Sequence, residues 1–121
     1  MVRYVLDEHL RGPLWRAIRW HNGRGEFPID VVRVGDSPDL PLGTLDPEIF
    51  VWAERAGRIL VSFDRNALAG HLADHLNAGL QSPGIFLIRP RFTLPQIVSF
   101  LTDAAYASKP EEWLNRITYI P

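Results

Sequence analysis

Short apolar runs alternate along this chain with segments in which apolar residues recur at helical spacing. Residues 2–6, 29–34, 58–63 and 85–88 form the apolar runs, which are typical of strands buried on both faces of a parallel sheet. Residues 113–120 are expected to add an edge strand. Alternating strands and helices favour an α/β fold, with a largely parallel sheet of four to five strands and right-handed crossovers.

Helix boundaries are marked by well-defined signals in the segments between these runs. Pro13 suits a first helical turn, and Asn22-Gly23 suits the end of that helix. Asp46-Pro47-Glu48 predicts a helix start with Asp46 as the N-cap residue. Thr93 and Gln96 have the spacing of a capping box. The segment between residues 35 and 45 is rich in glycine, proline and aspartate, and we expect a long loop there.

The bulk composition limits the class of protein. A length of 121 residues predicts a single domain over 1–121, and 46% hydrophobic with 22% charged residues is typical of a globular chain. The net charge of −1 gives no overall attraction to nucleic acid or to a membrane. The absence of cysteine excludes disulfides and thiolate metal sites. With no signal-peptide pattern and no apolar run long enough to cross a bilayer, we expect a cytoplasmic protein without membrane contact.

Acidic residues follow two of the predicted strands directly. Asp7 and Glu8 come after the first strand, Asp64 comes after the strand at 58–63, and Asp46 precedes the helix that leads into that strand. Ligands bind at the carboxyl ends of strands in an open α/β sheet, so these acids are expected to converge. Two carboxylates about 5 Å apart repel by roughly 3 kcal/mol at a dielectric of about 20. A hard cation such as Mg²⁺ or Mn²⁺ relieves that repulsion, so the pattern predicts a metal-dependent phosphodiester hydrolase.

Each acid also has a structural interpretation. An acid before Pro-Glu stabilises a helix start by about 1 kcal/mol through capping alone, and Asp64 has a similar position before its own helix. Asp7 has no evident capping role, because Gly12-Pro13 is the more natural start of the next helix. A capping carboxylate keeps free lone pairs, so the two roles are compatible.

Three segments together resemble the PIN-like domain family, in its short, toxin-like branch. They are Leu6-Asp7-Glu8-His9-Leu10, Gly43-Thr44-Leu45-Asp46-Pro47-Glu48-Ile49 and Arg58-Ile59-Leu60-Val61-Ser62-Phe63-Asp64-Arg65-Asn66, and the resemblance covers residues 3–89. It implies a compact three-layer α/β/α domain and a Mg²⁺- or Mn²⁺-dependent ribonuclease. It also implies RNA as the substrate, an antitoxin protein as a partner, and a homodimer.

The resemblance assigns a role to each matching residue. Asp7, Asp46 and Asp64 are the implied metal ligands, and Glu8 or Glu48 the implied outer base. Arg11, Arg65 and Asn66 are candidates for contact with the nucleic acid. The family usually has a second aspartate followed by phenylalanine where this chain has Asn66 and Ala67. Asparagine offers a metal or its water a carbonyl oxygen without charge, so a non-catalytic PIN-like binding module is the alternative.

Two further interpretations arise from the residues. A phosphoacceptor receiver domain would use Asp7-Glu8 as its acid pair, Asp64 as the phosphorylated residue and Lys109-Pro110 as the basic end of the last strand. His71 and His75 have a spacing that binds zinc in some helices. However, Leu68, Leu72 and Leu76 define the buried face of that helix, so we expect both histidines to face solvent or a partner.

Overall fold

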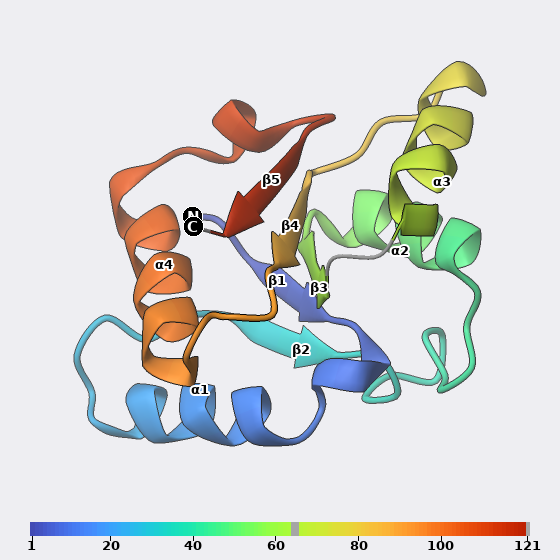
Figure 1. Cartoon of the computed structure of the whole chain (residues 1–121). Helices are drawn as coiled ribbons and strands as arrows, with labels where there is room; N and C mark the ends of the chain where they lie inside the picture. The colour runs from blue at the N-terminus through green and yellow to red at the C-terminus, as the bar shows by residue number, and fades with distance from the viewer. Residues whose placement is uncertain (64–65, 121) are drawn as a thin grey trace.

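A five-stranded parallel sheet lies between two pairs of helices in the computed structural model of this protein, which describes residues 1–63 and 66–120 (Figure 1). The side chain of Asn66 also lies outside the description. In chain order the elements are β1 (Tyr4–Leu6), a 3₁₀ turn η1 (Glu8–Leu10), α1 (Pro13–Gly23), β2 (Val31–Arg33), α2 (Asp46–Ala56), β3 (Ile59–Phe63), α3 (Asn66–Asn77), β4 (Ile85–Ile88), α4 (Leu94–Ala107), a second 3₁₀ turn η2 (Pro110–Trp113) and β5 (Ile117–Ile120).

The strand order β2-β1-β3-β4-β5 confirms the predicted α/β class. Every neighbouring pair is parallel, with Leu6 opposite both Arg33 and Val61 in the register. The chain runs outward from β1 to β2 and then returns past β1 to continue with β3. This order has its topological switch point between β1 and β3, where ligands bind in doubly wound sheets.

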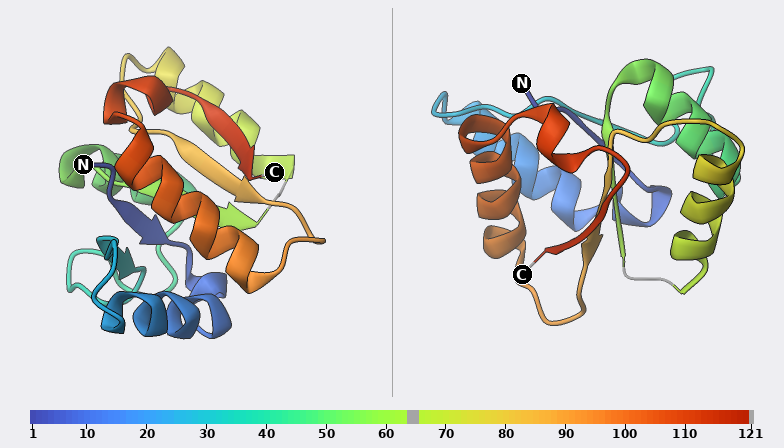
Figure 2. Two further views of the ribbon diagram at one scale, coloured as in Figure 1. Left: turned by 90° about the vertical axis from the view of Figure 1, so that its left-hand side faces the viewer. Right: turned by 90° about the horizontal axis from the view of Figure 1, so that it is seen from above.

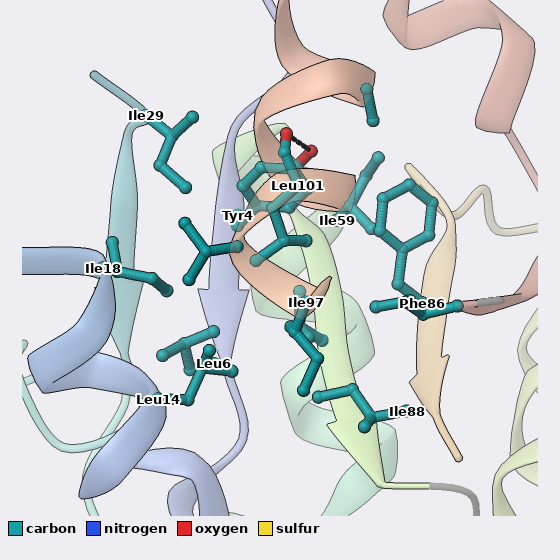
Figure 3. Packing of buried hydrophobic residues seen from close by; sticks show 14 of the residues in the cluster. Tyr4, Leu6, Leu14, Ile18, Ile29, Ile59, Phe86, Ile88, Ile97 and Leu101 are labelled. Atoms are coloured by element: carbon teal, nitrogen blue, oxygen red, sulfur yellow. Dashed lines mark hydrogen bonds between the residues drawn. The ribbon is translucent and has the colours of Figure 1, made fainter. Parts of the chain in front are cut away.

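Alternation along the strands divides the apolar side chains between two cores. Tyr4, Leu6 and Val61 face α1 and α4, whereas Val5 and Leu60 face α2 and α3. Figure 2 shows the two helix layers on opposite sides of the sheet, as expected for a three-layer α/β/α fold. Figure 3 shows the first core, in which the buried Tyr4 hydroxyl donates a hydrogen bond of 2.7 Å to the carbonyl oxygen of Leu101. Burial raises the pKa of this tyrosine well above its ordinary value.

Several helix ends follow the sequence signals. Gly57 ends α2 in a left-handed conformation (φ 65°), and Thr93 and Gln96 form a reciprocal capping box at α4. The predicted N-cap role of Asp46 is wrong, because the N-cap of α2 is Leu45 and Asp46 is the first helical residue. An acid in the first turn still favours the positive end of the helix dipole.

The C-terminal strand is shorter than the sequence indicated. Only Ile117–Ile120 pairs with β4, because Pro110–Trp113 forms η2 instead of extending the strand. No helix among residues 1–63 and 66–120 is long and apolar enough to cross a bilayer.

Candidate functional site at the carboxyl edge of the sheet

Asp7 lies at the carboxyl end of β1, and its residue is only 4% exposed. The Ser62 hydroxyl on β3 donates a hydrogen bond of 2.7 Å to Oδ2 of Asp7, and the Glu8 amide donates one of 2.8 Å to Oδ1. The Asp7 amide in turn donates to the carbonyl oxygen of Val61. A buried carboxylate requires such donors, because desolvation without them is costly. The expectation that Asp7 has no capping role was wrong, since it is the N-cap residue of η1.

Ser62 is the site residue that the sequence reasoning missed. Its side chain is fully buried and is the only polar one in the strand sequence Ile-Leu-Val-Ser-Phe. A hydroxyl inside an otherwise apolar strand needs a partner, and this was the available signal. The partner is the acid at the end of the neighbouring strand.

Glu8 connects the end of β1 to the long loop before α2. Its Oε1 accepts a hydrogen bond of 2.9 Å from the Gly43 amide. Gly43 has a φ of +84°, which favours glycine, and it lies three residues before Asp46. The Glu8 contact therefore fixes the segment that leads to Asp46.

Asp46 opens α2, on the side of the sheet that Asp7 and Ser62 also face. Its side chain is 17% exposed, and its Oδ2 lies 4.0 Å from Nε2 of His71 on α3. Glu48, in the first turn of the same helix, is exposed to solvent. The structure thus places one acid between α2 and α3 and leaves another at the surface nearby.

Arg11 contributes charge to the β2 side of this edge. Its guanidinium lies 3.7 Å from Oδ1 of Asp36, which also binds the guanidinium of Arg33 at 2.9 Å. Burial alone raises the pKa of Asp36, but the hydrogen bonds and charge of Arg33, with the charge of Arg11, lower it below its usual value. Asp36 therefore offsets part of the positive charge that was expected to contact nucleic acid.

Asp64 and Arg65, two of the predicted site residues, lie outside the described residues. A further predicted residue, Asn66, is described only as the first residue of α3. Among the residues that are described, no three histidine or acidic side chains lie close enough together to hold a metal ion. What the described part of the edge brings together is Asp7 with Ser62, Glu8 with the 35–45 loop, and Asp46 with His71. A three-ligand set on this edge requires Asp64.

His75 is buried, whereas the leucine face of this helix predicted that it would face solvent or a partner. Its residue is 6% exposed, and its Nε2 lies 2.7 Å from the carbonyl oxygen of Gln81 and 3.6 Å from Oε2 of Glu54. His71 is partly exposed and faces Asp46 instead. The two histidines thus have different partners, and His75 joins α3 to the segment before β4.

The receiver-domain interpretation also required Lys109 at the end of the last strand. Lys109 precedes η2 and lies before β5, so it is at the opposite end of that strand from the acids.

Comparisons with family models, with curated proteins and with solved structures found no significant match for this chain.

Proposed function

We propose that this protein is a divalent-metal-dependent ribonuclease whose acidic site lies at the carboxyl edge between β1 and β3. The observation that carries the proposal is the buried Asp7 carboxylate, held by Ser62 at the topological switch point of the sheet. Asp64 directly follows Phe63, the last residue of the adjacent strand. An Asp64 carboxylate close to the enclosed Asp7 would be costly unless a cation joined the two.

The donor chemistry fits a hard cation, provided that Asp64 completes the set. Asp7, Asp46 and Asp64 offer only carboxylate oxygens, which Mg²⁺ and Mn²⁺ prefer. The Asp7 carboxylate accepts hydrogen bonds from the Ser62 hydroxyl and the Glu8 amide, and these donors would orient it toward a cation. A divalent ion bound there would activate a water molecule and offset negative charge on the scissile phosphate.

The chain's own groups have distinct tasks in this proposal. Ser62 and the Glu8 amide orient the Asp7 carboxylate. Glu8 is committed to the Gly43 amide, so the exposed Glu48 is the better candidate to accept a proton from the attacking water. Arg11 and Arg65 would contact the phosphodiester backbone.

Two measurements test the proposal. One is a calorimetric titration with Mn²⁺, and the other is the cleavage of a labelled single-stranded RNA. Asp7→Asn and Asp64→Asn each remove one negative ligand at nearly constant volume, and we expect each to weaken Mn²⁺ binding at least about tenfold and to abolish cleavage. Asp103→Asn, at an exposed position on α4, is the matched control and should leave both unchanged. Equal Mn²⁺ affinity in the wild type and Asp7→Asn would reject the assignment.

A non-catalytic RNA-binding module is the second candidate. It is favoured by Asn66 and Ala67, which stand where the PIN-like pattern has an acid and an aromatic residue, and by the structural use of both Asp7 oxygens. Such a module would bind RNA without cutting it at saturating Mn²⁺. The antitoxin partner and the homodimer implied by the resemblance stay predictions, which co-expression with the neighbouring reading frame and sedimentation equilibrium would test.

A further inference from the structure

A small apolar pocket opens at the carboxyl edge of the sheet, on the face covered by α1 and α4. Its volume is about 210 Å³, and its floor is formed by the buried side chains of Leu14, Ile88 and Ile97. Figure 3 shows these three residues at the end of the core toward which β3 and β4 point. Phe63 and Phe92 also line the pocket, and the Phe63 residue is 43% exposed.

The pocket adjoins the candidate acids along the chain. Phe63 immediately precedes Asp64, and His9, which also lines the pocket, lies two residues after Asp7. Asp7 and Ser62 belong to the α2–α3 side of the sheet, whereas Phe63 alternates to the α1–α4 side. An RNA strand that crosses this edge would therefore meet the acids on one side of the sheet and the pocket on the other.

Two arginines lie in the connection between β4 and α4, and one of them lines the pocket. Arg89, at its lining, and Arg91 are exposed in the connection between β4 and α4, and the Arg89 guanidinium lies 4.6 Å from the centre of the Tyr119 ring. No acidic side chain is among the described residues that line this pocket. An apolar, aromatic hollow lined by one arginine, with a second arginine two residues further along the chain, matches a ligand that alternates flat rings with phosphates.

We propose that this pocket holds one unstacked base of a single-stranded RNA, with Phe63 as the stacking surface and Arg89 and Arg91 on the adjacent phosphates. The inference rests on the proposed function and narrows its substrate class. The pocket is smaller than the ~300 Å³ lower limit of most small-molecule sites, which suits a single base rather than a whole nucleotide. A base paired in a duplex cannot leave its stack to enter without an unpairing cost, so single strands are selected.

Fluorescence anisotropy of a labelled oligouridine of about ten nucleotides, measured in EDTA so that the RNA stays intact, tests the pocket. We expect Phe63→Ala and Phe63→Leu each to weaken binding about tenfold or more, since stacking contributes ~1–3 kcal/mol per base. Trp20→Ala is the matched control, because Trp20 is a 69% exposed aromatic residue beside Arg24 outside this pocket. Trp20→Ala should change the RNA affinity less than about twofold, because it is a surface substitution outside the pocket.

A scan of single abasic positions in the RNA needs no protein variant and gives a second measurement. Wild type should lose affinity at one position, and Phe63→Ala should lose that position dependence. Equal losses in Phe63→Ala and Trp20→Ala, equal binding of duplex RNA, or no sensitive position would each overturn the inference. If Asp7→Asn abolishes cleavage while Phe63→Ala binds RNA as tightly as the wild type, the base-binding pocket is rejected and the proposed ribonuclease is retained. Position-dependent binding without any metal-dependent cleavage would retain the pocket and reject the ribonuclease.

Discussion

The hydrogen bond between Ser62 and Asp7 joins a side chain on β3 to the acid at the end of β1. The two groups are 55 residues apart in the chain, and both are buried. A hydroxyl donor holds the carboxylate oxygen in one orientation. The site therefore depends on strand pairing as much as on the acids themselves.

We expect Ser62→Ala to lower the free energy of unfolding by about 1–3 kcal/mol, because it removes a donor from a buried carboxylate. Urea unfolding monitored by tryptophan fluorescence measures the loss. Ser99→Ala, at an exposed position on α4, is the control and should change stability by less than about 0.5 kcal/mol. A value for Ser62→Ala equal to that of the control would show that the bond contributes nothing.

The lowered pKa of Asp36 predicts that the stability of the fold depends on pH. Its pKa is lowered in the folded state, mainly by Arg33, so the unfolded chain takes up a proton at higher pH than the folded one. The stabilisation is complete above the unfolded pKa of about 3.9 and is lost as the pH falls through the folded pKa. Asp36→Asn should cost at most about 1 kcal/mol at pH 7.

The comparison of wild type with Asp36→Asn across the acid range checks this sign. The difference in unfolding free energy should shrink as the pH drops below about 4, because asparagine does not titrate. Asp103→Asn serves again as an exposed carboxylate control. A difference that grows toward low pH would contradict the assigned direction.

Among the glycines, Gly84 before β4 has the shortest distance from an added Cβ to another atom, at its contact with η2. Gly84 has a φ of +121°, and a Cβ there would lie 2.5 Å from the backbone oxygen of Trp113. Backbone cannot withdraw as a flexible side chain can, so Gly84→Ala should destabilise the fold by about 3 kcal/mol or more. Thermal unfolding followed by circular dichroism measures the effect.

Gly79→Ala separates the steric conflict from the backbone strain. Gly79 also has a positive φ, +82°, but nothing lies within 4 Å of an added Cβ. Its substitution should therefore cost only the left-handed penalty, about 1 kcal/mol. Equal losses at the two glycines would show that the Trp113 contact does not limit this junction.

Local signals were sufficient to predict most elements from the sequence. Apolar runs gave β1, β3 and β4, and the Thr93–Gln96 spacing gave the start of α4. The start of β5 was predicted too early, because the 3₁₀ turn η2 was missed, although Pro110 begins it and the Lys109 amide donates a hydrogen bond to the Glu112 side chain within it. The burial of His75 follows from Gln81 and Glu54, which lie on other segments.

The candidate site was predicted less completely than the fold. The position of Asp7 at the end of β1 was predicted from the apolar run before it, and the start of α2 was predicted from the Asp46-Pro47-Glu48 signal. The role of Ser62 and the contact of Glu8 with Gly43 required the register between β1 and β3 and the path of the loop. Such pairings join residues far apart in sequence, and single-chain patterns carry little information about them.

At the scale of the whole molecule, the sheet separates two cores that share no helix. Ile97 belongs to the α1–α4 core and Ile49 to the α2–α3 core, and both are at least 96% buried. Ile97→Val and Ile49→Val should each cost about 0.5–1.5 kcal/mol. Because the sheet lies between them, the double variant should equal the sum within about 0.5 kcal/mol in denaturant unfolding. A larger deviation would mean that the sheet transmits packing changes between its faces.

The central place of β1 has a consequence for synthesis. This strand is three residues long and pairs with β2 on one side and with β3, more than fifty residues later, on the other. During translation β1 leaves the ribosome before β2 and β3, and one of its edges stays open until β3 has emerged. The nascent chain therefore carries an unpaired strand edge for much of its elongation, and the hydrogen bond from Ser62 to Asp7 forms only after β3 has been synthesised.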